Sequence, residues 1–339
     1  MAKRWQALGV IVGLSTAAVV ACGAPDSGAG DETTTPAPST AHGADAPDDE
    51  ASGERGEPAA APSAPAPSSP AASPRTRHVY GKSQRGEELV YEEVTPEKPG
   101  ARRALLTFGV HGFEDAWDHD GYALYEIAVA LLDHYAKTPN DLSGWTIDIV
   151  PTANPDGMRA GANNDREGSA GAFGRCTANG EDLNRSFSTS EFAEHDALEA
   201  LVDRLKPTVV LDFHGWYNCT YGDAKLGGYF ASAFNASYAG KPSKYCFVSG
   251  TGAMDCGPTL GGTFHRNTTI SKDLFAEWAT SQRRIPSVLV EFPAPDYDNN
   301  GRFDTVPDRA LGFDRMAPAT LDKMVGRARV AMNALFAGY

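Results

Sequence analysis

Two histidines and one glutamate in this sequence have the types and spacing of a metal site. His111 and Glu114 are three residues apart and follow the apolar run Ala104–Val110, so an imidazole and a carboxylate could bind one ion in the turn after a strand. His214 directly follows a second apolar run, Thr208–Phe213. Two histidines and one carboxylate leave a fourth position open for water, as in catalytic zinc sites. For His214 taken alone, a structural role near the sheet edge is the alternative.

A second glutamate stands where a charge is costly to bury. Glu291 is the fifth residue of the apolar run Ser287–Phe292. A carboxylate in such a run carries a large desolvation cost unless a partner holds it there. Beside a bound metal it could serve as a general base that deprotonates water.

An Asn-Arg pair offers a site for a carboxylate. Asn184 and Arg185 lie within the segment Asp182–Phe187. A guanidinium binds a carboxylate with two parallel hydrogen bonds, and a neighbouring amide can assist it. Each of these features is ambiguous by itself, but together they indicate hydrolysis of a bond near a carboxylate.

Strands alternating with helices must position these residues. The apolar runs predict strands, and apolar residues at helical spacing predict helices. The strands are expected at Ala104–Val110, Trp145–Thr152, Thr208–Phe213 and Ser287–Phe292, and the helices at Tyr122–Ala136, Phe192–Leu205 and Pro318–Phe336. This order predicts an α/β fold with helices on both faces of the sheet. Ligands bind beyond the carboxyl ends of the strands in such sheets, and Gly157–Gly180 is expected to be a long, functional loop.

The motifs and their order resemble the zinc carboxypeptidase family. The resemblance extends over roughly residues 79–337 and rests on five motifs in sequence: His111-x-x-Glu114, Asn154-Pro155-Asp156-Gly157, Asp182-Leu183-Asn184-Arg185-Ser186-Phe187, His214 and Glu291. It implies a single catalytic domain built on a mixed, mainly parallel twisted sheet. It also implies one zinc ion held by His111, Glu114 and His214, with Glu291 as general base and then proton donor.

The same resemblance assigns the substrate-binding residues. Asn184 and Arg185 would bind the carboxylate of the substrate. The family also has an arginine that polarises the scissile carbonyl, and Arg175, in Arg175-Cys176-Thr177-Ala178-Asn179-Gly180, matches it best. Arg159 and Arg166 are the alternatives. Trp278, thirteen residues before Glu291, matches an aromatic residue of the family, and no residue is assigned to orient the metal-binding histidines, Asp212 included.

The N-terminus predicts export and a lipid anchor. Met1–Arg4 is positively charged and Leu8–Val20 is uncharged and apolar or small, which is typical of a secretory signal. Val19-Val20-Ala21-Cys22-Gly23 resembles a bacterial lipobox, which implies a signal peptide over residues 1–21 and acylation of Cys22. The protein would then be an exported lipoprotein held at the membrane on the periplasmic or cell-surface side. A plain signal peptide cleaved elsewhere is the alternative.

Composition separates a tether from the domain. The chain has 339 residues and a net charge of −14, and residues 24–74 hold nine acidic residues and one arginine, a balance of −8. That segment has no Leu, Ile, Val, Met or aromatic residue and cannot offset its ordering entropy. We therefore predict a disordered Pro/Ala/Ser-rich tether over residues 22–76 and the catalytic domain over 77–339. The acidic balance argues against nucleic acid as a partner.

Four cysteines and one acidic loop leave further alternatives. Cys176, Cys219, Cys246 and Cys256 would form two disulfides in an oxidising compartment, or remain buried free thiols. The loop from Asp296 to Asp304 resembles the start of a calcium-binding loop, but Pro307 stands where its last glutamate belongs. Calcium and a solvated acidic loop are the two interpretations.

The predicted function is zinc-dependent hydrolysis of an amide bond next to a carboxylate. Digestive members of the family carry a tyrosine about twenty residues before the catalytic glutamate, whereas this chain has none within Asn267–Ser271. The resemblance therefore leaves two substrates, peptide C-termini and the γ-D-glutamyl-diaminopimelate bond of murein peptides. The other hypotheses are a deacylase of N-acyl amino acids and a non-catalytic binder of peptide carboxylates. The sequence does not indicate an oligomeric state.

Overall fold

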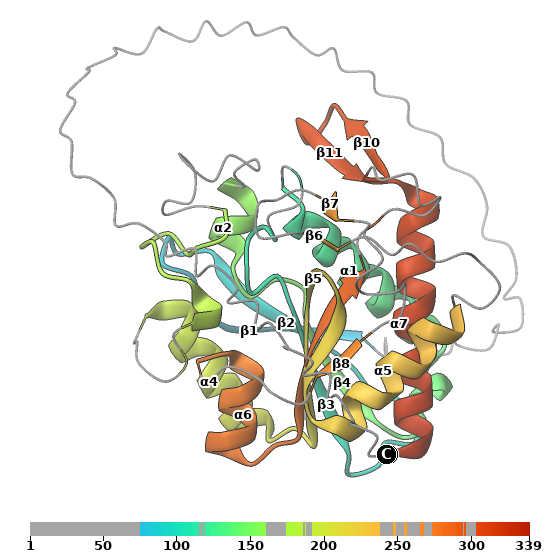
Figure 1. Cartoon of the computed structure of the whole chain (residues 1–339). Helices are drawn as coiled ribbons and strands as arrows, with labels where there is room; N and C mark the ends of the chain where they lie inside the picture. Colours follow the sequence, from blue (N-terminus) through green and yellow to red (C-terminus); the bar gives the residue numbers. More distant parts are fainter. Residues whose placement is uncertain are drawn as a thin grey trace, which may run out of the picture. The chain divides into compact units, whose positions relative to one another are not determined.

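Strands and helices alternate along most of the chain in the computed structural model (Figure 1). The structure describes residues 75–114, 117, 119–160, 174–185, 187, 192–237, 247–248, 254–255, 265–267, 273–293, 295 and 303–339. The strands are β1 (Arg75–Lys82), β2 (Glu88–Val94), β3 (Arg103–Phe108), β4 (Thr146–Val150), β5 (Val209–Gly222), β6 (Phe247–Val248), β7 (Met254–Asp255), β8 (His265–Asn267), β9 (Ser287–Pro293), β10 (Thr305–Asp308) and β11 (Phe313–Met316). The helices are α1 (Gly121–Lys137), η1 (Pro139–Leu142), α2 (Pro155–Ala160), η2 (Leu183–Arg185), α4 (Ala193–Leu205), α5 (Ala224–Ser237), α6 (Phe275–Arg283) and α7 (Pro318–Gly338).

The main sheet is mixed and mostly parallel, as expected. Its strand order is β1-β2-β4-β3-β5-β8, and β9 also pairs with β5. β3 pairs in parallel with β4 and β5, and β5 with β8, whereas β1, β2 and β4 are joined by antiparallel pairing. The four predicted strands are confirmed as β3, β4, β5 and β9. The β1–β2 hairpin was not predicted, because its half-exposed strands lack a continuous apolar run.

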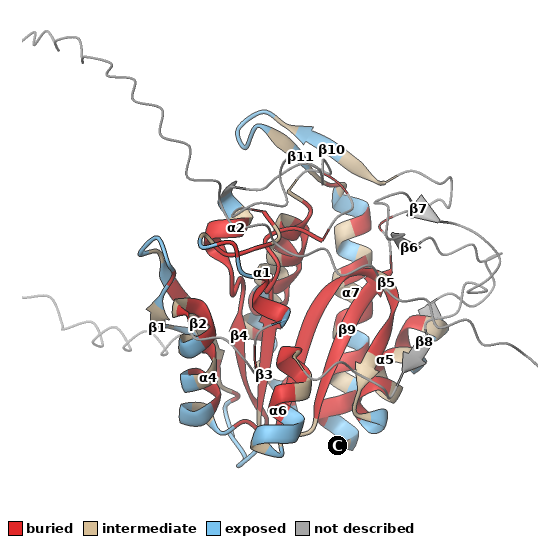
Figure 2. Ribbon diagram, turned by 60° about the vertical axis from the view of Figure 1, so that its left-hand side comes forward, coloured by how far each residue is buried: buried red, intermediate tan, exposed pale blue. Residues whose placement is uncertain are grey.

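Helices cover both faces of this sheet and bury it. One core contains apolar residues of α1, α5 and α7 packed on the strands, and a second contains residues of α4 and α6 on the other face. Figure 2 shows the central strands buried throughout and the outer faces of the helices exposed. Strands buried on both faces explain why β3, β4, β5 and β9 were recognisable as apolar runs.

The three predicted helices are confirmed as α1, α4 and α7. α1 buries Leu124, Ile127, Leu131 and Tyr135, which lie on one face of a helix with 3.6 residues per turn. α7 has Pro318 in its first turn, where the missing N–H has no helical partner to lose. α5 and α6 were not predicted.

Strand β5 changes direction around β9. Val210 to Trp216 lie opposite Ser287 to Pro293 in ascending order, and the partners then descend, from Cys219 opposite Glu291 to Gly222 opposite Val288. The Gly215–Trp216 peptide bond in this reversal is cis. As a result β9 has parts of β5 on both sides, and Glu291 is flanked by both.

Several predictions concern residues that the structure does not describe. Residues 1–74 lie outside the described ranges, and with them Cys22, the signal peptide and nearly all of the tether. So do Arg166, most of Asn267–Ser271 and most of the acidic loop after Asp296. β1 begins at Arg75, two residues before the domain boundary expected from composition. None of the helices in the described ranges is long and apolar enough to span a bilayer.

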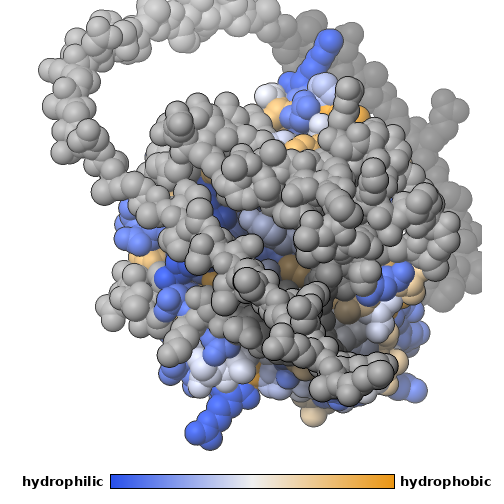
Figure 3. Space-filling model, in the orientation of Figure 1, coloured by the Kyte–Doolittle hydropathy of each residue, from blue (hydrophilic) through white to orange (hydrophobic). Residues whose placement is uncertain are grey.

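The described surface has no large cluster of exposed apolar side chains. The large hydrophobic residues exposed on it are Val79, Val306, Leu311 and Val330. Figure 3 shows hydrophilic and hydrophobic residues mixed over the described part of one face. Scattered apolar residues of this kind are normal on a soluble surface.

Candidate active site

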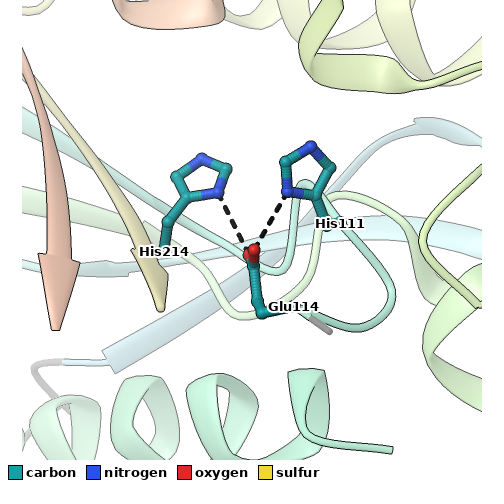
Figure 4. Close-up of side chains that lie close together, drawn as sticks. All are labelled: His111, Glu114 and His214. Carbon is teal, nitrogen blue, oxygen red and sulfur yellow. Dashed lines mark hydrogen bonds and ion pairs between the residues drawn. The ribbon is translucent and has the colours of Figure 1, made fainter. Parts of the chain in front are cut away.

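The three predicted metal ligands converge on one point. Nδ1 of His111 lies 3.1 Å from Oε2 of Glu114, and Nδ1 of His214 lies 3.1 Å from its Oε1. Figure 4 shows the two imidazoles on either side of the carboxylate. One potential ligand atom from each residue lies within 4.8 Å of the others, and all three side chains are buried.

The ligands come from the turn after β3 and from within the neighbouring strand β5. Phe108, the last residue of β3, lies opposite Phe213, so His214 follows at the level where β3 ends. His111 and Glu114 occupy the turn after β3. That turn is closely packed, because a Cβ on Gly112 would lie 1.9 Å from the carbonyl oxygen of Gly174. Only glycine fits there, which explains its place between the two ligands.

Two aspartates orient the imidazoles. Nε2 of His111 lies 3.0 Å from Oδ1 of Asp182, and Nε2 of His214 lies 3.0 Å from Oδ2 of Asp212. A carboxylate accepts hydrogen bonds, so each Nε2 carries a proton and donates it to its aspartate, which leaves Nδ1 as the nitrogen available to a metal beside Glu114. A metal requires the neutral tautomer that keeps its proton on Nε2, and the donor set therefore fits zinc.

Sequence reasoning did not assign these orienting residues. Asp212 was left without a role, yet it lies two residues before His214, and alternate residues of a strand share a face. Its other oxygen accepts a hydrogen bond from Thr107 at 2.7 Å. Asp182 was visible only as the start of a motif, and no local signal indicates its contact with His111, 71 residues away.

Charges in the site shift one another's pKa strongly. Burial would raise the pKa of Glu114, but the adjacent His111 and His214 hold it at about 2. Burial would lower the pKa of His214, but the carboxylates of Asp212 and Glu114 raise it well above its usual value. Such a site binds a metal by releasing a proton from His214, so its affinity must fall at low pH.

Glu291 lies next to the ligands and is buried. It stands opposite His214 in the β5–β9 pairing. Among the described residues its Oε2 has no hydrogen-bond partner. Burial and, to a smaller degree, the charge of Glu114 raise the pKa of Glu291 to about 8, although His214 and Arg175 act in the opposite direction. A carboxyl group with a pKa near neutrality can both accept and donate a proton.

Arg175 lies close to the site, whereas Arg159 does not. Nε of Arg175 lies 3.0 Å from Oδ2 of Asp182, the same carboxylate that orients His111. Its backbone carbonyl accepts hydrogen bonds from the side chain of Asn154 and from Gly112 N–H. Arg159 is at the surface in an ion pair with Glu87, its side chain 65% exposed. Of the two arginines that the structure describes, Arg175 is therefore the better placed.

Asn184 and Arg185 differ in exposure. Asn184 is buried: its Nδ2 lies 3.3 Å from Nε2 of His214, and its Oδ1 accepts the N–H of Phe275 at 2.9 Å. Arg185 is exposed, with Nη1 donating to the carbonyl of Asn184 at 2.8 Å. The structure thus gives Asn184 a supporting position behind His214. Carboxylate binding by both residues stays a prediction.

The aromatic residue that matches the family lies apart from the metal ligands. Trp278 is buried in the core formed by α4 and α6, where its ring lies 6.0 Å from that of Phe275.

The cysteines differ from the prediction of two disulfides. Cys219 is a buried free thiol on β5, while Cys176 is disulfide-bonded. The expectation of two disulfides among the four cysteines is therefore wrong, because Cys219 is enclosed within the sheet. Cys246 and Cys256 lie outside the described residues.

Comparison with known proteins agrees with this geometry. Residues 71–204 match the family model described as zinc carboxypeptidase. This part of the chain is thus similar to zinc carboxypeptidases. The match includes His111 and Glu114, and the structure adds His214 and Glu291 from beyond it.

One curated relative of this chain is Bacteriocin BCN5 of Clostridium perfringens. The two are 32% identical over 178 residues. The alignment covers 46% of this chain and 19% of the bacteriocin. The relative is thus a much longer protein, of which this chain matches about a fifth.

Solved structures show the same fold. Carboxypeptidase A of Helicoverpa armigera aligns with a TM-score of 0.50 at 18% identity, covering 78% of this chain and 69% of that one. A metallocarboxypeptidase of Pseudomonas aeruginosa aligns with a TM-score of 0.51 at 15% identity, covering 78% and 64%. The bovine thrombin-activatable fibrinolysis inhibitor has a TM-score of 0.51 at 11% identity, covering 78% and 89%.

Proposed function

We propose that this protein is a zinc-dependent metallopeptidase that hydrolyses an amide bond next to a carboxylate of its substrate. The observation that carries the proposal is the convergence of His111 Nδ1, Glu114 and His214 Nδ1, with the buried Glu291 on the neighbouring strand. A metal-binding structural site would not need an additional carboxyl group with an unpartnered oxygen. A hydrolytic site needs one as a base.

The three ligands would hold zinc in a largely buried position and leave further coordination to water or substrate. Zinc supplies a Lewis acid that polarises a carbonyl group and activates water. Asp182 and Asp212 keep the two imidazoles in the tautomer that binds it. Because these carboxylates are themselves held by Arg175 and Thr107, the ligand geometry is fixed before any metal arrives.

Glu291 and Arg175 would handle the proton and the charge. Glu291 accepts a proton from the attacking water and delivers it to the leaving nitrogen. Arg175 is positioned by Asp182 and would donate hydrogen bonds to the carbonyl oxygen as it becomes negative. The two residues are far apart in sequence but share one electrostatic environment, since Arg175 lowers the pKa of Glu291.

For the substrate we propose a peptide whose carboxylate is bound by Arg185. Its guanidinium is exposed next to the ligand-orienting residues, which suits recognition of a group at the mouth of the site. The two substrate classes are a protein or peptide C-terminus and the γ-D-glutamyl-diaminopimelate bond of murein peptides. The bacterial envelope address predicted from Cys22 favours murein peptides.

The experiment combines metal analysis with hydrolysis. Full-length protein is expected to hold one zinc per chain and to cleave either L-Ala-γ-D-Glu-diaminopimelate or a standard C-terminal peptide. Glu291→Gln is expected to keep zinc and lose about 10²- to 10⁴-fold in kcat/KM. Stoichiometric zinc with no hydrolysis above the Glu291→Gln level on either substrate contradicts the proposed peptidase. N-acetyl amino acids in the same panel test the deacylase alternative.

We also propose that Cys22 carries the membrane anchor. Cells expressing the wild-type chain are expected to incorporate radiolabelled palmitate into it and to retain it in the membrane fraction. Cys22→Ala should release the protein in unlabelled form. Equal labelling of both forms contradicts acylation at this residue.

A further inference from the structure

We propose that Asp120 is a positioning residue that sets the distance between the two segments carrying the metal ligands. The inference rests on the proposed zinc site. Asp120 is fully buried. One of its oxygens, Oδ1, accepts the backbone N–H of Glu114, and the other, Oδ2, accepts the indole N–H of Trp216 at 3.2 Å.

These two donors belong to different parts of the metal site. Glu114 is a ligand in the turn after β3, which also carries His111. Trp216 lies on β5, two residues after the ligand His214, and 96 residues from Asp120 in sequence. A single carboxylate therefore joins the turn with two ligands to the strand with the third.

From its position in the sequence, Asp120 would be expected to cap helix α1. It stands immediately before α1, where an aspartate normally accepts hydrogen bonds from the first N–H groups of the helix. Here its side chain makes no such bond to α1. Both oxygens are directed to the ligand-bearing segments, at the expense of the helix cap. A residue with a purely helical role would be oriented otherwise.

The surroundings make the connection rigid. A Cβ on Gly121 would lie 2.1 Å from the carbonyl oxygen of Gly112, so the start of α1 is packed directly against the ligand turn. The rings of Trp117 and Trp216 stack with centroids 5.2 Å apart. Because both segments that Asp120 joins are closely packed, its bonds to Glu114 and Trp216 can hold the ligands at a set spacing.

Substitutions at Asp120 and at Trp216 test the hydrogen bonds of Asp120. Asp120→Asn keeps the size of the side chain but replaces one accepting oxygen by an amide that faces an N–H donor. We expect its zinc dissociation constant, measured by competition with a chelator, to rise about 10- to 100-fold. Trp216→Phe removes only the indole donor and should raise it about fivefold. The double variant should differ little from Asp120→Asn, because both changes remove the same connection.

A second readout reports geometry directly. Cobalt-substituted Asp120→Asn is expected to show an altered visible absorption spectrum, which a mere loss of stability would not produce. Asp141→Asn is the matched control, since Asp141 contacts His134 at the far end of α1, and it should leave both measurements unchanged.

The outcomes distinguish this inference from the proposed function. A folded Asp120→Asn protein with a wild-type cobalt spectrum and a zinc affinity within twofold of wild type overturns the role of Asp120. If that variant does not fold, unchanged zinc affinity in Trp216→Phe overturns it. Wild-type protein that binds zinc but cleaves nothing contradicts the peptidase alone, whereas wild-type protein that binds no zinc contradicts both.

Discussion

Two clusters of buried charge lie on the same sheet, and only one is arranged for chemistry. After β3 and within β5, the ligands His111, Glu114 and His214 face one another. On β4, Asp148 is also fully buried, at 3.2 Å from Arg103 on the neighbouring strand. Arg103 in turn lies 2.8 Å from Glu93 on β2.

The difference lies in which atoms remain available. In the Asp148 cluster a guanidinium, which can only donate, bonds one oxygen each of Asp148 and Glu93, and Oδ2 of Asp148 has no hydrogen-bond partner among the described residues. In the site, each aspartate is bonded to Nε2 of an imidazole, so the Nδ1 atoms, which lie beside Glu114, are available as ligands. Buried charge alone therefore does not identify a functional site. A functional site is identified by ligand atoms that point toward one shared position.

Removing a metal ligand should have the largest effect, on both zinc content and hydrolysis. We expect His214→Ala to lose stoichiometric zinc after dialysis and to reduce hydrolysis to background, because two ligands rarely retain the metal. Zinc content by elemental analysis and hydrolysis of the peptide panel measure this. A variant that keeps one zinc per chain would place the metal elsewhere and break the comparison.

Replacing an orienting aspartate should have the next largest effect. Asp182→Asn weakens the bonds to His111 and Arg175, and we expect the zinc dissociation constant to rise about 10- to 100-fold. Asp148→Asn is a matched control, since it changes another buried aspartate of the same sheet and should leave zinc affinity unchanged. Equal losses in both variants would show that the effect comes from buried charge in general.

The Asp148 cluster should instead control how stability depends on pH. Burial is the main factor that raises the pKa of Asp148, from 3.8 to about 7. The folded protein then binds a proton more tightly than the unfolded chain, so folding takes up a proton between about pH 4 and 7. The contribution of Asp148 to the free energy of unfolding must fall as the pH rises through this range, by at most about 1.4 kcal/mol per unit.

Urea unfolding of wild-type and Asp148→Asn proteins from pH 5 to 8 measures that slope. We expect the difference between their unfolding free energies to change across the series, with wild type losing more stability as pH rises. Parallel curves would mean that Asp148 titrates as in the unfolded chain.

A surface ion pair should give the smallest effect. Nε of Arg283 lies 2.6 Å from Asp203, but the side chain of Asp203 is 54% exposed. We expect Asp203→Asn to change stability by less than about 1 kcal/mol and zinc affinity not at all. Measured in the same urea and chelator series, it sets the baseline for both buried clusters. A larger change in stability would show that the short distance between two charges contributes more than their burial does.

Much of the fold was predictable because its central strands are buried on both faces. Continuous apolar runs identified β3, β4, β5 and β9, and helical spacing identified α1, α4 and α7. The β1–β2 hairpin escaped prediction, since one face of its strands is exposed and the apolar signal is weak. The reversal of β5 around β9 also escaped it, because pairing partners are not encoded in local periodicity.

In the site, the sequence by itself determined the ligands and the candidate base. His111 and Glu114 follow a strand, and His214 and Glu291 are polar residues in or directly after apolar runs, so local pattern and motif order reveal them. Only the tertiary structure decided which groups hold them in place. Asp182 lies 71 residues from His111, and Trp216 lies 96 from Asp120, so no spacing connects them. Ligand identity is a local property of residue type and strand position, whereas lone-pair direction and distance arise from contacts between segments far apart in the chain.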